Sequence, residues 1–245
     1  MNSRLVRSKV ARYLSVAVLP LAVAGGISAA AAEENTGGPR YTYFDTGYKW
    51  TDVLYAVEQP GGTHNGVQLN GSLGLAKVGP VGIQVFGQFF DGNFDGSTVE
   101  FDDGELGTIT CSDSRDSQAV AGGLGAYLPI AEKTNFELRA GYIDITKFQT
   151  PNNLCQLVSA SDTGYFGEAM IRSEMSENVE LEVGFRYSEL SDSNISNNDV
   201  LLGLGYHVTD YLTLRATGIV FDTDTGFELS ARLYFGEFLG RDTIF

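Results

Sequence analysis

Apolar and polar residues alternate with a period of two in ten segments of the chain. Val179, Leu181 and Val183, for example, alternate with Glu180 and Glu182. A period of two is the side-chain period of a β-strand, because successive residues point to opposite faces. The alternation predicts strands over 41–51, 66–77, 81–90, 117–127, 135–146, 163–174, 179–190, 199–208, 212–221 and 226–236.

Short and long connections alternate between these segments. The short ones cover 78–80, 128–134, 175–178 and 209–211, and the others cover 52–65, 91–116, 147–162, 191–198 and 222–225. Outer-membrane barrels of bacteria have an even number of strands, short periplasmic turns and longer external loops. We therefore predict an all-β, antiparallel, up-and-down transmembrane barrel of about ten strands, with eight as the alternative. The 91–116 connection is long enough to hide two more strands.

The apolar faces of the segments are expected to meet lipid. They include Val81, Ile83, Val85, Phe89, Phe136, Leu138, Ala140, Tyr142, Val200, Leu202, Leu204, Tyr206, Val208, Phe227, Leu229, Ala231, Leu233 and Phe235. Aromatic residues lie near both ends of these runs, as in the two interfacial girdles of membrane barrels. The alternative is a soluble β-sandwich or lipocalin-like barrel, in which the apolar faces would point inward.

The first 32 residues have the pattern of a secretory signal peptide. Arg4, Arg7 and Lys9 make a basic start, an apolar run over 13–27 is too short to span as a helix, and small residues at 30–32 suit cleavage. We expect residues 1–32 to be removed and residues 33–245 to form the barrel domain. A membrane-anchoring helix is the alternative.

The chain is acidic, with a formal net charge of −15 that becomes −19 without the four bases of the signal. This balance argues against binding to nucleic acid, which requires a basic face. Cys111 and Cys155 are the two cysteines, and both fall in predicted external loops. An even count in an exported chain predicts a disulfide between them. Two unpaired thiols, or a metal-binding pair, are the alternatives.

Charged residues occupy the faces that would line the lumen, and their signs nearly balance. A narrow lumen cannot hold unpaired charge cheaply, so a structural network of ion pairs is the favoured interpretation. A narrow, charge-lined pore is the alternative. The predicted network comprises Asp45, Lys49, Glu137, Arg139, Glu168, Arg172, Glu174, Glu180, Glu182, Arg186, Arg215, Glu228 and Arg232.

The 91–102 segment holds one motif that resembles a calcium-binding loop. Asp91, Asn93 and Asp95, followed by Gly96 and Asp102, place oxygen ligands at the spacing of such loops. The helices that usually flank these loops are not predicted here, and a solvated acidic loop is the favoured interpretation. Apart from this weak calcium site, we expect no cofactor.

Catalytic residues are not evident. His64 falls in a predicted external loop, where Asp222 and Asp224 of another loop could approach it, and His207 lies on the predicted lumen face near Asp210. No strand carries a His–Asp or paired-carboxylate motif of the kind that hydrolases use. The sequence therefore favours a protein that is not an enzyme.

The chain resembles the small outer-membrane β-barrel proteins of Gram-negative bacteria, the OmpA/OmpX-type group. The resemblance rests on the opening strand Tyr41-Thr-Tyr-Phe-Asp-Thr-Gly-Tyr48, on strand ends such as Gly203-Leu-Gly-Tyr206, and on the terminal Phe245. The chain differs from the best-known members of this group in its number of strands, since ten are predicted here and those members have eight. The alternation also fades after Phe235.

This resemblance implies the cell outer membrane as location, outer-membrane lipids as surroundings, and the barrel-assembly machinery as a partner during biogenesis. That machinery would use Phe245 as an assembly signal. The function it implies is membrane integrity or surface interaction and adhesion through acidic external loops, with an unknown surface ligand. A small porin-like channel and an omptin-like barrel hydrolase are the alternatives.

Overall fold

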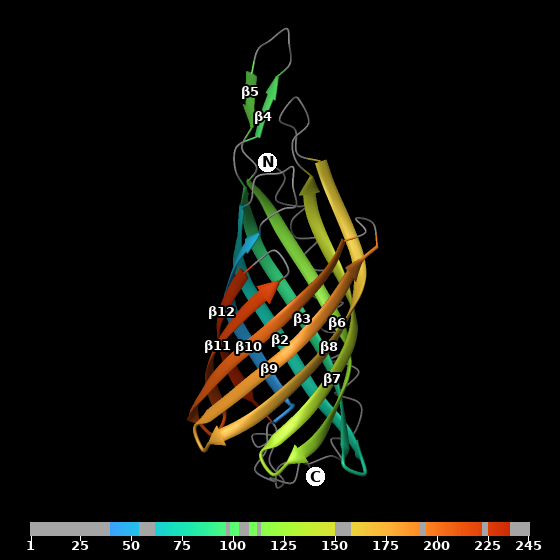
Figure 1. Cartoon of the computed structure of the whole chain (residues 1–245), viewed down its shortest axis with the longest axis vertical. Helices are drawn as coiled ribbons and strands as arrows, with labels where there is room; N and C mark the ends of the chain where they lie inside the picture. Colours follow the sequence, from blue (N-terminus) through green and yellow to red (C-terminus); the bar gives the residue numbers. More distant parts are fainter. Residues whose placement is uncertain are drawn as a thin grey trace.

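Ten long strands form one closed antiparallel barrel in the computed structural model of the chain (Figure 1). The structure describes residues 40–53, 62–96, 99–102, 108–111, 114–149, 158–191, 195–221 and 225–235. Within these residues, no helix is long and apolar enough to cross a membrane. The strands are β1 (Tyr43–Val53), β2 (Gly62–Val78), β3 (Val81–Gly96), β4 (Val99–Asp102), β5 (Thr108–Cys111), β6 (Ser114–Ala131), β7 (Thr134–Gln149), β8 (Val158–Ser176), β9 (Val179–Leu190), β10 (Ile195–Thr209), β11 (Leu212–Phe221) and β12 (Thr225–Tyr234).

Each barrel strand pairs with the barrel strands before and after it, and β1 pairs with β12 to close the wall. The remaining two strands, β4 and β5, pair only with each other in a separate two-stranded sheet, which stands beyond the rim of the barrel (Figure 1). The prediction of ten barrel strands is therefore confirmed, and the alternative of eight is wrong. The 91–116 connection does contain two further strands, but they do not enter the barrel.

Several strands run further than the sequence pattern indicates. β3 continues to Gly96 instead of ending at residue 90, β2 begins at Gly62 instead of 66, and β8 begins at Val158 instead of 163. In these extensions the outward positions are polar, so the hydrophobic alternation stops while the backbone ladder continues. Alternation detects the part of a strand that meets lipid, whereas pairing with a neighbour determines where the strand ends.

The wall is apolar outside and polar inside. Large hydrophobic side chains are exposed on the outer surface, among them Leu124, Leu138, Val183, Phe185, Leu202, Leu204, Leu214, Leu229 and Leu233. The fully buried side chains inside are mostly polar or charged. This inversion contradicts the alternative of a soluble sandwich or lipocalin-like barrel, and it is the arrangement expected of a strand wall in lipid.

Aromatic residues lie near both ends of the outer apolar surface. The exposed ones include Tyr48, Trp50, Tyr142, Tyr165, Tyr187 and Phe227 on one side and Tyr206, Tyr211 and Phe235 on the other. Tyr48, Trp50 and Phe227 contact one another in a row, with ring centroids 4.5 Å and 6.3 Å apart. This distribution matches the two predicted girdles.

Tight two-residue turns lie at one end of the barrel, which we call the turn end, and the longer connections lie at the loop end. The β2–β3 turn consists of Gly79 and Pro80, and Gly79 adopts a positive φ of 62°, which favours glycine. The two ends of the described chain also meet at the turn end, where the Phe235 amide donates a hydrogen bond to the Thr42 carbonyl at 3.2 Å.

Candidate functional site in the barrel lumen

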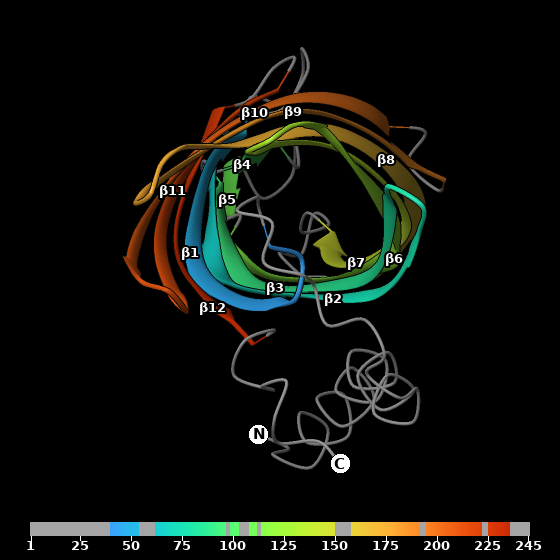
Figure 2. The same cartoon turned by 90° about the horizontal axis from the view of Figure 1, so that it is seen from below.

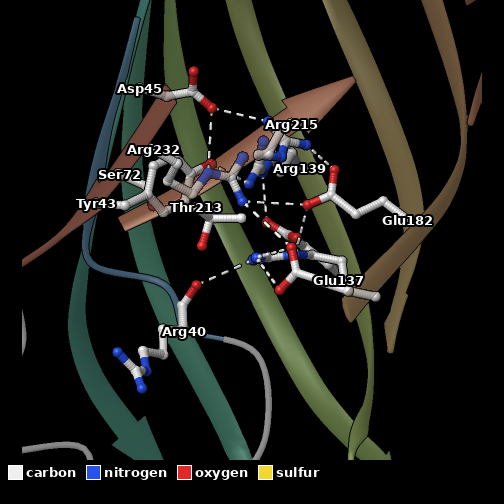
Figure 3. Close-up of polar contacts among 12 residues, drawn as sticks. Arg40, Tyr43, Asp45, Ser72, Glu137, Arg139, Glu182, Thr213, Arg215 and Arg232 are labelled. Atoms are coloured by element: carbon white, nitrogen blue, oxygen red, sulfur yellow. Dashed lines mark hydrogen bonds and ion pairs between the residues drawn. The ribbon is translucent and has the colours of Figure 1, made fainter. Parts of the chain in front are cut away.

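Charged side chains from six strands form two ion-pair clusters inside the barrel. Figure 3 shows part of both, including Asp45, Glu182, Arg215 and Arg232 of one and Glu137 and Arg139 of the other. The first cluster joins β1, β8, β9, β11 and β12, and the second joins β7, β8 and β9. Each cluster contains as many arginines as carboxylates. The first consists of Asp45, Glu180, Glu182, Arg172, Arg215 and Arg232. The second consists of Glu137, Glu168, Arg139 and Arg186.

Glu182 is the centre of the first cluster. Its Oε1 lies 3.0 Å from Arg172 Nε and 3.2 Å from Arg232 Nη1, and its Oε2 accepts from Arg215. Asp45 Oδ2 accepts from both Arg215 at 2.8 Å and Arg232 at 3.2 Å. Because each arginine contacts at least two carboxylates, the removal of one acid affects several strands at once.

Glu168 has the same bridging role in the second cluster. Its Oε2 accepts from Arg186 Nη2 at 2.6 Å, and its Oε1 lies 3.5 Å from Arg139 Nη1. Arg139 also pairs with Glu137, two residues earlier on the same face of β7. Since strand residues i and i+2 share a face, the sequence places this pair directly.

A hydrogen-bonded chain extends the second cluster across the barrel. Ser72 Oγ of β2 donates to Gln84 Oε1 of β3 at 2.6 Å, and the amide of Gln84 donates to Glu137. Gln84 and Glu137 are both fully buried. Buried polar groups need such partners because desolvation is otherwise uncompensated.

Aromatic rings stack on most of the lumen arginines. Arg232 Cζ lies 3.9 Å from the centroid of Tyr43, and the Tyr43 hydroxyl accepts a hydrogen bond from Arg139 at 3.0 Å. Tyr43 therefore connects the two clusters. Phe86 and Phe166 lie beneath Arg139 and Arg186 at 5.4 Å and 5.6 Å. Cation–π contacts of this kind are stronger when desolvated.

The other three members of the predicted network lie outside these ion pairs. Lys49 and Glu228 occupy directly opposite positions on β1 and β12. Glu174 lies opposite Glu180 at the turn end, where it lines a small cavity. Ten of the thirteen predicted residues are thus joined by the described ion pairs.

Several lumen residues were not predicted from the sequence. Asp199 of β10 is buried and lies directly opposite Arg186 of β9. It is one of the alternate, odd-numbered positions of β10 that point into the lumen. Gln84 and the inward aromatic rings were also missed, although their parity could have identified them. Tyr41 was predicted to begin the first strand. Instead, the strand begins at Tyr43, and Tyr41 lies fully buried inside the lumen.

The two histidines lie at opposite ends of the barrel. His64 was predicted in a loop but belongs to β2, where its ring contacts Phe90 at 4.7 Å. His207 lies at the turn end as predicted, and its Nδ1 is 2.6 Å from Thr213 Oγ1. Asp222 and Asp224, the proposed partners of His64, lie outside the described residues.

The calcium motif is extended in the structure. Asp91, Asn93 and Asp95 lie on β3 rather than in a loop, with exposed side chains. An extended strand does not provide the sharp turn that wraps a calcium loop around its ion. Asp102 lies on β4. Among the side chains that the structure describes, no group of three acids, histidines or cysteines is close enough to hold a metal ion.

The remaining predicted features lie partly or wholly outside the described residues. Cys111 ends β5, but Cys155 is not among the described residues, so the disulfide stays a prediction. The signal peptide over 1–32 and the assembly residue Phe245 also lie outside them.

Comparison with known proteins gives a family but no specific function. The family model described as outer membrane protein beta-barrel domain matches residues 18–207. None of the curated proteins matches the chain. Similar solved structures include the translocator domain of autotransporter NalP from Neisseria meningitidis, at 8% identity and TM-score 0.46, covering 94% of this chain and 98% of that one.

Two further structures are similar at a comparable level. The KdgM porin in complex with disordered oligogalacturonate has 10% identity and a TM-score of 0.43, covering 79% of this chain and 99% of that chain. The attachment invasion locus protein Ail of Yersinia pestis, in complex with the heparin analogue sucrose octasulfate, has 14% identity and a TM-score of 0.37, covering 79% and 96%.

Proposed function

The chain belongs to the outer-membrane β-barrel family, and we propose that it is a non-enzymatic barrel with a closed lumen. Its function would lie in its external, acidic loops, through membrane integrity or surface interaction. Family membership implies the outer membrane as its location. During biogenesis its partner would be the barrel-assembly machinery.

The filled lumen is the observation that supports this proposal. The two clusters and the Ser72–Gln84 chain draw on strands from all sides of the barrel, and their side chains are almost all buried. Each cluster has as many arginines as carboxylates, so its charges are satisfied within the protein and do not need an ion from solution. Barrels of about this size have interiors that side chains alone can fill. A passage for solutes would require several ion pairs to break together.

Single-channel conductance tests the closed lumen. The mature chain would be refolded, inserted into a planar bilayer, and shown to be folded by its resistance to unfolding in detergent on a gel. We expect an inserted barrel that is electrically silent. As a matched variant, Glu182→Gln with Arg215→Ala removes the centre of the first cluster and should give more frequent current steps. Discrete, reproducible steps from the parent protein would support the porin-like alternative instead.

An activity assay tests the absence of enzyme function. The hydrolase alternative requires a histidine near a carboxylate or serine. His207 Nδ1 lies 2.6 Å from the hydroxyl of Thr213, but that hydroxyl belongs to a fully buried residue and is not presented to a substrate. The contact described for His64 is with the ring of Phe90, which is neither a nucleophile nor an acid. We expect peptide and ester hydrolysis by the refolded barrel to equal that of a His64→Ala, His207→Ala double variant. A loss of hydrolysis in that variant would contradict the proposal.

A further inference from the structure

Residues 40–42, which precede β1, leave the barrel wall and enter the lumen at the turn end (Figure 2). Tyr41 is fully buried, and its ring stacks on Tyr127 of β6 with centroids 3.6 Å apart and planes 8° from parallel. Gly82 provides the space for this stack, because a Cβ atom at Gly82 would overlap the ring of Tyr127. The wall is therefore shaped to receive this segment.

Thr42 attaches the segment to both neighbouring parts of the wall. Its Oγ1 accepts a hydrogen bond from the Gly74 amide of β2 at 3.1 Å. Its carbonyl accepts from the Phe235 amide, just after β12, at 3.2 Å. Thr42 thus holds the point at which the chain turns from the wall into the lumen.

Arg172 joins the segment to the first ion-pair cluster. Its Nη1 donates to the Arg40 carbonyl at 3.2 Å, and its Cζ lies 5.0 Å from the centroid of Tyr41. The same guanidinium binds Glu180 at 3.0 Å. Tyr41 therefore lies between the network and the mouth of the barrel and shields the network on that side.

Arg40 occupies the mouth itself. Its guanidinium donates to the Asp210 carbonyl and lies 5.5 Å from the centroid of Tyr234. Arg40 and Tyr234 line a cavity of about 230 Å³ together with three carboxylates, those of Glu174, Glu177 and Glu180. The surroundings are thus suited to a guanidinium group, with an aromatic face, a carbonyl acceptor and nearby negative charge.

From these contacts we propose that residues 40–42 form a latch that closes the turn end of the barrel. The acidic cavity lies beside the latch, and Arg40 forms part of its lining. Release of the latch exposes the lower lumen to the periplasm and removes a positive charge from the lining of the acidic cavity. The proposal goes beyond the closed lumen, since the two ion-pair clusters above Tyr41 remain a separate barrier when the latch opens.

Thiol accessibility at Asn135 tests the latch. Asn135 is buried in the lower lumen, directly opposite Arg172 on β8. Asn135→Cys would be introduced into a full chain carrying Cys111→Ser and Cys155→Ser, and its reaction with a small cationic methanethiosulfonate reagent would be timed. Arg40→Ala with Tyr41→Ala opens the latch. Lys77→Ala is the matched control, since it removes an exposed base from the same end.

We expect the latch variant to react about tenfold faster than the parent or more, because it loses one aromatic stack and two cation–π contacts. The Lys77→Ala control should react at the parental rate. Equal rates in all three proteins would overturn the proposal. If the double variant does not refold, Arg40→Ala alone removes one of the two cation–π contacts, and we expect a smaller increase that still exceeds the rate of the Lys77→Ala control. Single-channel conductance of the latch variant tests the closed lumen separately from the latch. A variant whose thiol at position 135 reacts quickly, but which passes no current, supports both proposals.

Discussion

Carboxylates occur in two different settings in this barrel, inside the lumen and on the outer wall near the loop end. Glu182 is buried and contacts three arginines. Asp91 and Asp95 are exposed on β3, and the contact described for Asp91 is a 3.1 Å hydrogen bond from Gln118. The same chemical group is thus buried among arginines in one place and exposed to solvent in the other.

Desolvation explains this difference. A carboxylate that loses its water must be compensated by ion pairs and hydrogen bonds, or it destabilises the fold. An exposed carboxylate keeps its water and contributes little through any neighbour. The lumen clusters are accordingly balanced in charge, whereas the chain as a whole has a net charge of −15. The excess of acids is tolerated where the side chains remain hydrated.

Of the changes considered, Glu182→Gln should lower the free energy of unfolding the most. The variant keeps the shape of the side chain but leaves three arginines with one carboxylate fewer. Breaking a buried ion-pair cluster destabilises by about 3–5 kcal/mol. The free energy of unfolding would be measured by urea titration of the barrel in lipid vesicles or detergent.

Asp95→Asn is the matched control for that measurement, because it makes the same acid-to-amide change on the outer wall. We expect its free energy of unfolding to stay within about 0.5 kcal/mol of the parent. Similar losses in both variants would mean that the lumen and the outer wall do not differ as described.

Arg186→Ala should have a smaller effect than Glu182→Gln. Its side chain is 25% exposed, so less of its charge is desolvated. Its partner Glu168 also keeps Arg139 at 3.5 Å. We expect a loss of about 2 kcal/mol, between the values for exposed and fully buried pairs. A larger loss than in Glu182→Gln would show that the second cluster, rather than the first, dominates the stability of the lumen.

The strand number, the direction of the faces and the lumen charges were predictable from the sequence, because each follows from a period of two. Glu137 and Arg139, for example, are two residues apart on one strand and pair in the structure. Parity also assigns a residue to the lumen whatever its partner is. This is why ten of the thirteen predicted residues lie within the described clusters.

Partners across the barrel were not predictable in this way. Arg232 shares the inward face of β12 with Glu228, yet it pairs with Asp45, Glu180 and Glu182 of other strands. These contacts depend on the diameter and register of the closed barrel. The inward turn of Tyr41 was missed for a related reason, since an alternating pattern continues through Tyr41 and Tyr43 although the wall begins only at the second.

Ser72→Ala tests the neutral end of the lumen network. The change removes the hydroxyl that donates to Gln84 at 2.6 Å and leaves no charge unpaired. We expect a loss of about 1 kcal/mol, the usual net contribution of a neutral hydrogen bond. Gln84→Ala should lose more, because it also removes the donor to the fully buried Glu137. The same urea titration measures both, and a reversed order would contradict the proposed role of Gln84.

The smallest effect is expected from Asp91→Asn, which tests whether the carboxylates of the outer wall bind calcium. β3 holds Asp91 and Asp95 on an extended strand, and four residues of strand separate their Cα atoms by roughly 13 Å. One ion with ligand distances of about 2.4 Å cannot bridge that span. Titration calorimetry at millimolar calcium should therefore give equal, negligible heats for the parent and for Asp91→Asn. A saturable heat that Asp91→Asn abolishes would mean that this part of the wall binds calcium, and that an exposed carboxylate of the outer wall has a specific ligand.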